Sequence, residues 1–456
     1  MTSVTDSVIF GNILSTPECA AIWSDKTRTK YYLDFEASLA KVQADLGIIP
    51  EEAAAAICAH CRLELYDWDE LRTQTERIGY PVLPVVKQLV KMANESAPGK
   101  NLGEWAHWGA TTQDVTDTAT SLQLRDTFAL VSSSLDTIVN HLRTLAEKHK
   151  HTPMAARSNL QQAVPQTLGF KLARLLSTFA RHRTRLCSLQ SRIFLLEFSG
   201  AAGTLATLPS ALALNCQSRL AAALSLTVPQ IAWHTERDNI AEAGSFLALL
   251  SSTCAKFATD VSLLMQTEID EVREPYGPER GSSSTMPQKR NPIGSAYVAA
   301  CAATARQLSS ALLGAVVADH ERSTGPWEVE WIVLPQLCCL AHAALRHTAD
   351  MLAGLEVRPD AMAHNLEITA GGVVSEAVMM GVAERMGRQV AHDLVYELCA
   401  KAREEARPLA EVLVEDGRVG LSKEEAERLC DPENYLGLSV EMTERVLRET
   451  AEMTRS

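Results

Sequence analysis

A polar loop, YGPERGSSSTMPQKRNPIG at residues 276–294, carries the densest group of chemically useful side chains in this 456-residue chain. It combines the hydroxyl groups of Ser283 and Ser284 with the ammonium of Lys289 and the amide of Asn291. Glycines and prolines around them allow the backbone amides to face a ligand. Together these groups can hold an anion and transfer a proton. The same composition also fits a solvated surface loop, so residue types alone leave both interpretations open.

A second polar segment, HWGATTQD at residues 107–114, lies near an expected helix start. The adjacent hydroxyl groups of Thr111 and Thr112 lie beside the expected start of that helix, where free backbone N–H groups favour anions. They could therefore bind a carboxylate. The alternative is structural, with a threonine or an aspartate capping the helix, and residue types alone favour this alternative.

Two further segments place polar side chains ahead of helical patterns. RSNLQQ at residues 157–162 precedes an apolar helix, and HER at residues 320–322 precedes a tryptophan-rich one. A buried Arg322 near an acidic ligand would bind its carboxylate through two parallel N–H groups. In the structural alternative, His320 and Glu321 form no more than an ion pair at a helix end.

Helical patterns dominate the rest of the chain and must position these four segments. A helix is expected from Ser24 to Gly47, and the most persistent apolar period follows Pro165. Apolar residues recur there at steps of three, four or seven, at Leu168, Leu172, Leu175, Phe179, Leu186, Leu189 and Ile193. Strand patterns are almost absent. The sequence therefore predicts an all-α protein built on a bundle of long helices.

Composition narrows the function classes. Hydrophobic residues make up 46% and charged residues 22%, as in ordinary globular proteins. A net charge of −13 without a long basic run argues against a nucleic-acid surface. No apolar stretch reaches the ~18 residues that span a bilayer, and eleven scattered cysteines suit a reducing compartment. We expect a cytoplasmic protein with no nucleic-acid or membrane partner. No ligand cluster or nucleotide motif stands out, which predicts no metal and no organic cofactor.

The loop resembles the G-S-S-x-M-P-x-K-x-N signature of the fumarase/aspartase superfamily. The segments around Thr111 and Ser158 resemble two other conserved segments of that superfamily, in the same order. The resemblance covers essentially the whole chain. It implies a three-domain, all-α fold with an N-terminal helical domain at residues 1–105, a central long-helix bundle at 106–355 and a C-terminal helical domain at 356–456.

Several stretches resemble the 3-carboxy-cis,cis-muconate cycloisomerase branch of this superfamily. They are HWGATTQDVTDT (107–118), NLQQAVPQTLG (159–169), WHTERD (233–238), LLMQTEIDEV (263–272), HERSTGPWEVEW (320–331) and DPENYLG (431–437). The adenylosuccinate lyase branch fits less well, because it has a proton-donating His where Asn159 stands and a phosphate-binding Arg where Trp331 stands. Adenylosuccinate is therefore not expected to be a substrate.

Two positions depart from the signature. Ser282 stands in place of its Gly, which is expected to stiffen the loop. Gln288 replaces the His that is usual in the cycloisomerase branch, although the argininosuccinate branch also has Gln there. Gln cannot take up or donate a proton as His can. The resemblance therefore supports carbanion chemistry and leaves the substrate open.

The resemblance implies a role for each matching residue. Ser283 is expected to be the general base, or the acid in the reverse direction, with its pKa lowered by Lys289 and loop amides. Lys289 and Asn291 are expected to hold the carboxylate that accumulates charge. Substrate contacts are expected at His107, Thr111, Thr112, Ser158, Asn159, Gln161, His234, Arg237, Met286 and Arg322.

The implied reaction is carbanion chemistry on an unsaturated polycarboxylate. Cycloisomerase-like lactonisation ranks first, and decarboxylation of an unsaturated tricarboxylate, as in trans-aconitate decarboxylases, ranks second. β-Elimination from a succinyl-type substrate is a further alternative. A catalytically silent structural relative is the alternative from another class, and the intact Ser283, Lys289 and Asn291 argue against it. The resemblance also implies a homotetramer in which three subunits contribute to each active site.

Overall fold

The computed structural model describes residue 4 and residues 6–453. The chain forms two compact units, each assembled from separate stretches of sequence. Unit 1 comprises Met1–Ser134, Arg183–Cys254 and Tyr297–Leu345, and unit 2 comprises Leu135–His182, Ala255–Ala296 and Arg346–Ser456. The predicted domain boundaries after residues 105 and 355 stay a prediction. Residues 1–3, 5 and 454–456, at the ends of the predicted N-terminal and C-terminal domains, lie outside the described part of the chain.

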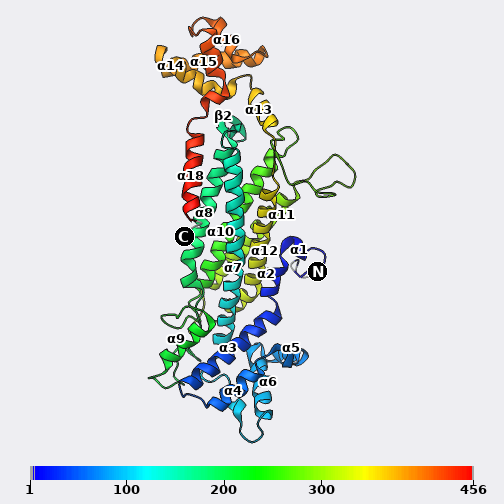
Figure 1. Ribbon diagram of the computed structural model, residues 1–456, viewed down its shortest axis with the longest axis vertical. Coiled ribbons are helices and arrows are strands. Elements are labelled where there is room, and N and C mark those ends of the chain that lie inside the picture. The colour runs from blue at the N-terminus through cyan, green and yellow to red at the C-terminus, as the bar shows by residue number, and fades with distance from the viewer. Residues whose placement is uncertain (1–3, 5, 454–456) are drawn as a thin grey trace. The chain divides into compact units, whose positions relative to one another are not determined.

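Short helices form the N-terminal part of unit 1 (Figure 1). They are α1 (Gly11–Leu14), α2 (Pro17–Ile22), α3 (Asp25–Asp45), α4 (Glu51–His60), the 3-10 turn η1 (Leu63–Leu65), α5 (Trp68–Ile78), α6 (Val82–Glu95) and η2 (Leu102–Trp105), joined later by α9 (Ala213–Leu224). The helix predicted between Ser24 and Gly47 is confirmed as α3. The Ser24 hydroxyl accepts a hydrogen bond from the Thr27 amide at 3.3 Å, and Gly47 follows with a φ of 70°.

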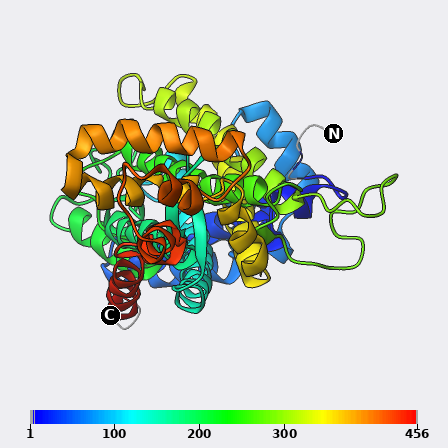
Figure 2. The same ribbon diagram turned by 90° about the horizontal axis from the view of Figure 1, so that it is seen from above.

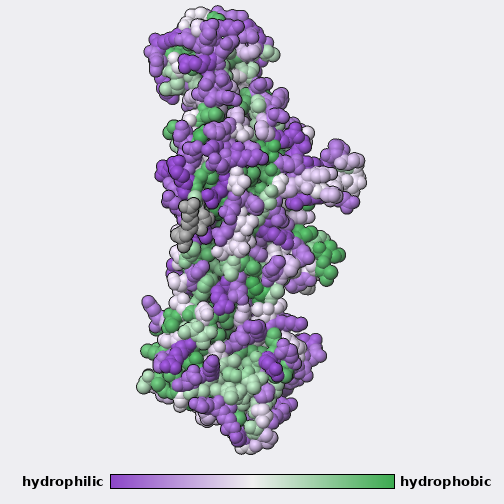
Figure 3. All heavy atoms as spheres, in the orientation of Figure 1, coloured by the Kyte–Doolittle hydropathy of each residue, from purple (hydrophilic) through white to green (hydrophobic). Residues whose placement is uncertain are grey.

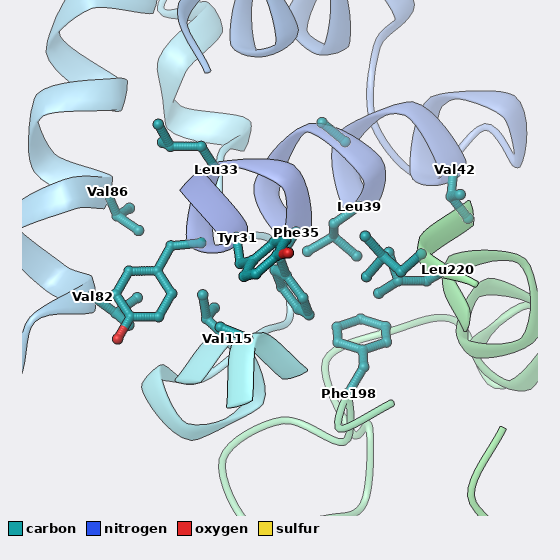
Figure 4. Packing of buried hydrophobic residues seen from close by; sticks show 14 of the residues in the cluster. Tyr31, Leu33, Phe35, Leu39, Val42, Val82, Val86, Val115, Phe198 and Leu220 are labelled. Carbon is teal, nitrogen blue, oxygen red and sulfur yellow. The ribbon is translucent and has the colours of Figure 1, made fainter. Parts of the chain in front are cut away.

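Helix α3 supplies the centre of the hydrophobic core in this region. Figure 4 shows its side chains Leu33, Phe35 and Leu39 among residues of α6, α7 (Thr112–Lys148), α9 and the loop before α9 that carries Phe198. Phe35 meets Phe198 edge-on, with ring centroids 6.2 Å apart. Leu33, Phe35, Leu39 and Phe198 are each at most 1% exposed. This core anchors the start of α7, which carries part of the candidate site.

Five long helices have residues in both units, as the apolar period predicts. They are α7 (Thr112–Lys148), α8 (Leu168–Ile193), α10 (Asp238–Leu264), α11 (Ile293–Ala315) and α12 (Pro326–Ala353). Within unit 1, Phe128 of α7 packs on Phe246 of α10 with ring centroids 5.7 Å apart. The described residues are mostly helical, so the all-α prediction is confirmed.

Unit 2 contains the C-terminal helices. They are α13 (Pro359–Glu367), η3 (Gly372–Val374), α14 (Ser375–Met386), α15 (Arg388–Glu404), α16 (Leu409–Asp416), α17 (Lys423–Cys430), η4 (Pro432–Tyr435) and α18 (Ser439–Met453). Val378, Leu398 and Val412 belong to their own small core. Figure 2 shows α15, in orange, lying along this helical cluster.

Two short antiparallel strand pairs in unit 2 were not predicted. β1 (Pro153–Ser158) pairs with β2 (Gln161–Thr167), and β3 (Val272–Arg273) pairs with β4 (Glu356–Val357). The β1–β2 hairpin coincides with the polar segment that the sequence placed ahead of a helix. Its register shifts between Ala155 and Arg157, so a bulge obscures the alternation that would reveal a strand.

The expectation that no segment is long and apolar enough to cross a membrane was wrong. Helices α10 and α12 pass by length and composition, with mean hydropathies of 1.3 and 1.2 in 18-residue windows, and a bent helix pair from Pro359 to Met386 would make a third. In unit 1 these helices pack closely. A Cβ added to Gly244 of α10 would lie 2.4 Å from Leu312 of α11 and 3.2 Å from Leu337 of α12. Helix packing therefore accounts for part of their apolar sequence.

Candidate active site

Asp114 is the hub of the predicted segment at the start of α7. Its Oδ2 accepts hydrogen bonds from the amides of Thr111 (2.9 Å) and Gly200 (3.0 Å). Its Oδ1 accepts from the Ser199 amide (3.1 Å) and lies 2.8 Å from Nε2 of His234. Capping of the helix by an aspartate is thus confirmed, and the same carboxylate ties three chain segments together. Thr111 and Thr112 are partly exposed at this helix start.

His107 is held against a buried carboxylate. Its Nδ1 lies 2.6 Å from Oε1 of Glu36, and its amide donates to Oε2 of the same side chain at 3.0 Å. Burial lowers the pKa of His107, but the Glu36 carboxylate outweighs burial and leaves the pKa raised. His107 also has a φ of 60°, within the left-handed region. The imidazole is therefore fixed in place and favoured in its cationic form.

His234 lies between two buried carboxyl groups. Nε2 is 2.8 Å from Oδ1 of Asp114 and 3.6 Å from Oε1 of Glu197, and the three side chains are at most 3% exposed. Burial lowers the pKa of His234, but the hydrogen bond to Asp114 and the charges of both carboxyl groups raise it overall. Burial raises the pKa of Glu197 to about 7. This part of unit 1 therefore holds a buried cluster of two carboxyl groups and one imidazole.

These three residues do not fit a metal site, although their potential ligand atoms lie within 4.8 Å of one another. A metal ligand needs a free lone pair directed at the ion. Three backbone amides and His234 already occupy the lone pairs of Asp114. The sequence missed this cluster because its members lie far apart in the chain. Their hydrogen bonds favour proton sharing over metal binding.

Arg237 lies in a fully matched ion-pair network. Its guanidinium donates to both oxygens of Asp117 at 2.7 and 3.1 Å and to both oxygens of Glu330 at 2.9 and 2.5 Å. A further contact to the Trp233 carbonyl at 3.4 Å occupies the remaining N–H. Trp327 also donates to Asp117, at 3.1 Å. Arg237 is 2% exposed. This placement favours a supporting role, and the predicted substrate contact stays untested.

Arg322 connects to the same region through two hydrogen bonds. Its guanidinium donates to Oε1 of Gln113 at 2.9 Å and to the Ala201 carbonyl at 2.9 Å. Gln113 in turn donates to the His234 carbonyl at 2.8 Å. No ion pair forms between His320 and Glu321 in the described part of the chain; instead the His320 carbonyl accepts from the Thr235 hydroxyl at 2.9 Å. Unit 1 thus brings together His107, Thr111, Thr112, His234, Arg237 and Arg322.

The tip of the β1–β2 hairpin in unit 2 carries Ser158, Asn159 and Gln161. Ser158 pairs with Gln161, and the two residues between them have positive φ, 50° at Asn159 and 64° at Leu160. Two consecutive residues in the left-handed region of backbone conformation define a tight hairpin turn, which matches the twist of the strands. Asn tolerates this conformation better than most residues. All four tip residues are exposed, Leu160 by 74%.

A buried ion pair supports the hairpin below its tip. Arg157 donates to both oxygens of Glu271, at 2.9 and 2.7 Å, and Glu271 is 0% exposed. Asn365 of α13 donates to the same carboxylate at 2.9 Å, and Gln162 donates to the Asn365 carbonyl at 2.7 Å. Hydrogen bonds to Glu271 and Asn365 therefore hold the hairpin below its tip, and the sequence did not predict them.

The polar loop is closed at its neck by backbone hydrogen bonds. The amide and the side-chain Nδ2 of Asn291 both donate to the Gly281 carbonyl, at 2.9 and 3.0 Å. Ser282 and Arg290 form an isolated bridge next to this pair. Figure 1 shows the loop, in green, extending from the helices, and Figure 3 shows its surface as mainly hydrophilic. Asn291 thus holds the loop, whatever further contact it makes.

Ser283 has a specific local environment within the loop. Its Oγ accepts hydrogen bonds from the amides of Met286 at 3.1 Å and Thr285 at 3.4 Å. Hydrogen bonds of this kind stabilise a negatively charged oxygen. Lys289 and Met286 are exposed, the latter by 42%. Ser282 does not have a positive φ, so serine causes no left-handed strain at the position where the signature has Gly.

Unit 2 thus contains the loop residues and the hairpin tip, and unit 1 contains the remaining predicted residues. Sequence reasoning missed Glu36, Glu197 and Glu271. A signal existed for Glu197, which interrupts the apolar run FLLEF at residues 194–198. A lone acidic residue within such a run predicts a buried carboxyl group with a partner.

Comparison with known proteins identifies the family of this chain. The family described as Lyase matches residues 13–306, and the adenylosuccinate lyase C-terminus matches residues 371–446. This chain belongs to that lyase family and, with it, to the fumarase/aspartase superfamily of enzymes.

The relatives narrow the reaction class. The chain is 52% identical to trans-aconitate decarboxylase 1 of Mycosarcoma maydis, over 96% of this chain and 88% of that one. It is 44% identical to 3-carboxy-cis,cis-muconate cycloisomerase of Pseudomonas aeruginosa, over 98% of each chain. It also matches the crystal structure of the 3-carboxy-cis,cis-muconate lactonizing enzyme from Pseudomonas putida with a TM-score of 0.92, at 40% identity, over 98% of this chain and 100% of that one. The predicted superfamily and fold are confirmed, and these relatives represent both of the first two predicted reactions.

Proposed function

We propose that this enzyme decarboxylates an unsaturated tricarboxylate such as trans-aconitate. The main support is that the Ser283 oxygen accepts hydrogen bonds from two loop amides, as a proton-transfer group would. A second acid is missing at two positions of the sequence. Asn159 and Gln288 stand where related enzymes have His. Decarboxylation needs one proton transfer and no acid for a leaving group. The higher identity to a decarboxylase than to a cycloisomerase supports this order, which reverses the order that the sequence favoured.

The proposed reaction breaks the bond between an allylic carbon and its carboxylate. Carbon dioxide leaves, and the electron pair spreads over the double bond into a remaining carboxylate as an enolate-like dianion. Cationic and hydrogen-bonding groups aimed at that carboxylate lower the barrier. Lys289 carries the charge suited to this role. The Ser283 hydroxyl then gives its proton to the carbanion and recovers one from water, which leaves an unsaturated dicarboxylate.

Lactonisation of 3-carboxy-cis,cis-muconate is the second candidate. The structural match at a TM-score of 0.92 supports it, because that neighbour is a lactonizing enzyme. Here a carboxylate of the substrate adds to its own double bond, and the carbanion is protonated by the same serine. Both candidates therefore use one loop and one proton.

A substrate panel separates the two candidates. Purified enzyme is mixed with trans-aconitate, 3-carboxy-cis,cis-muconate or adenylosuccinate, and ultraviolet loss of the alkene or diene is followed together with release of carbon dioxide. We expect carbon dioxide from trans-aconitate at about 1 per second or faster. Turnover of the muconate alone would replace the first candidate by the second. Adenylosuccinate should not react, because Asn159 and Trp331 replace the groups that its branch uses.

A homotetramer with composite active sites is part of the proposal. The exposed hairpin tip supports it, because Leu160 is 74% exposed there although it is a large apolar residue. Subunits carrying Ser283→Ala, mixed with subunits carrying Gln161→Ala, should regain part of the activity that each lacks alone. A monomer in sedimentation with full activity contradicts this assembly.

We further propose that the enzyme acts in the cytoplasm without a metal or organic cofactor, and without nucleic-acid or membrane partners. The net charge of −13 supports the absence of nucleic acid. The occupied lone pairs of Asp114 support the absence of a metal in unit 1. Activity lost to a chelator and restored by one divalent ion contradicts the cofactor-free reaction.

A further inference from the structure

Glu197 is a buried carboxyl group to which the proposed reaction gives no role. It is 0% exposed, and it lies in the loop that follows α8. Its backbone is fixed by Thr118 of α7, whose hydroxyl accepts from the Glu197 amide at 3.1 Å and donates to the Glu197 carbonyl at 2.9 Å. Its side chain faces His234, with Oε1 3.6 Å from Nε2. The imidazole of His234 thus lies close to both Glu197 and Asp114.

The two carboxyl groups around His234 have very different hydrogen bonding. Asp114 accepts from three backbone amides besides His234. Glu197 accepts from the Trp233 amide through Oε2 at 2.8 Å, whereas its Oε1 has no hydrogen-bond partner. Hydrogen bonds stabilise the ionised form of a carboxyl group, and a buried anionic oxygen without a donor is costly. If the Asp114 and Glu197 carboxyl groups hold one proton between them, that proton is therefore more stable on Glu197.

The neighbouring groups are consistent with this assignment. The charge of Arg322 opposes the rise in the His234 pKa. The charge of His234, and after it the Ser199 hydroxyl, oppose the rise in the Glu197 pKa. Burial and the charge of Asp114 act in the opposite direction and leave the pKa of Glu197 at about 7. The other neighbours, Thr118 and Gln113, are uncharged.

We propose that Glu197 is a positioning residue that carries a proton in the working enzyme, so that Asp114 alone receives the Nε2–H of His234. His234 then has one fixed orientation, with Nδ1 as the nitrogen left to meet a ligand. No protein group in the described part of the chain bonds Nδ1. When Glu197 ionises, a second anion competes for Nε2–H and loosens this orientation. This inference rests on the proposed function, because it takes His234 to contact the substrate.

The kinetic test uses Glu197→Gln, which keeps the shape of a protonated carboxyl group. In the wild type, kcat/KM for trans-aconitate should fall about tenfold for each pH unit above about 7, because only the protonated form is competent. The change should appear mainly in KM, since His234 binds rather than transfers a proton. The variant should lack this alkaline fall. A variant that loses 100-fold or more in kcat/KM at about pH 6 would show that the carboxylate itself is needed, and would overturn the proposal.

A spectroscopic test does not depend on turnover. The infrared spectrum of the full-length wild type should contain the carbonyl band of a protonated buried carboxyl group, which disappears as pH rises past about 7 and is absent from Glu197→Gln. Asp114→Asn is the matched control and should retain the band at low pH, but the band should disappear at a lower pH than in the wild type, because the charge of Asp114 no longer raises the Glu197 pKa. A band that remains in Glu197→Gln, or a stoichiometric metal ion that Glu197→Gln fails to bind, overturns the inference. If no panel substrate reacts, the proposed function fails while this test still decides the inference.

Discussion

The Asp114–Arg237 region of unit 1 and the Ser283 loop of unit 2 are built on opposite principles. In the first, Asp114, His234 and Arg237 are at most 3% exposed, and each charge is matched by hydrogen bonds. In the second, most side chains are exposed, and the neck is held by bonds between Gly281 and Asn291. The comparison separates a buried, hydrogen-bonded frame from an exposed loop that carries the proposed proton-transfer group. Substitutions in the frame should therefore change stability first, and substitutions in the loop should change rate first.

The largest effect is expected at Arg237. Arg237→Met leaves Asp117 and Glu330 buried without their cation, which should lower the free energy of unfolding by about 3–5 kcal/mol. Chemical or thermal unfolding measures this change. Arg192→Met is the control, because its pair with Glu242 is about half exposed and should contribute no more than about 1 kcal/mol. Equal stability of the two variants would show that the buried network of Arg237 contributes no more to folding than a partly exposed ion pair.

The next effect is expected at Ser283. Ser283→Ala removes the proposed proton-transfer group and should lower turnover by about 10²-fold or more. Substrate affinity should change little, because the other carboxylate contacts lie elsewhere. Unfolding should shift by no more than about 0.5 kcal/mol. Ser284→Ala is the matched control and should be milder. Near-full activity of a folded Ser283→Ala enzyme contradicts the mechanism, and an inactive Ser284→Ala beside it would identify the other serine.

The smallest effect is expected at the loop neck. Gly281 has a φ of 69°, and a Cβ there would lie 2.6 Å from the Asn291 carbonyl oxygen. Gly281→Ala should strain the neck by about 1–2 kcal/mol and lower turnover by about tenfold, because it displaces the loop. Gly277→Ala is the control, since its nearest neighbour would be 3.6 Å away. Identical kinetics for the two variants would show that the neck does not set the position of Ser283.

Local patterns in the sequence predicted the helices well. Helix α3 has both of its predicted end signals, Ser24 and Gly47, and the apolar period after Pro165 is helix α8. The sequence did not predict the β1–β2 hairpin, since its turn depends on positive φ at Asn159 and Leu160. It also did not predict the partners of His107, Arg157 and His234, because Glu36, Glu271 and Glu197 are brought to them by tertiary packing. Sequence periodicity contains no information on such distant pairs.

Glu274 links the two ends of the Ser283 loop. Its carboxylate accepts hydrogen bonds from the amides of Gly294 and Ser295 and from the Ser295 hydroxyl, at 2.7–2.9 Å. The residue before the loop thus caps the helix after it, and both ends of the intervening segment are fixed independently of what lies between them. Exchanges within residues 276–292 need not disturb the fold of α11. The start of α11 is therefore held by a residue outside the loop, and its cap does not depend on which side chains the loop presents.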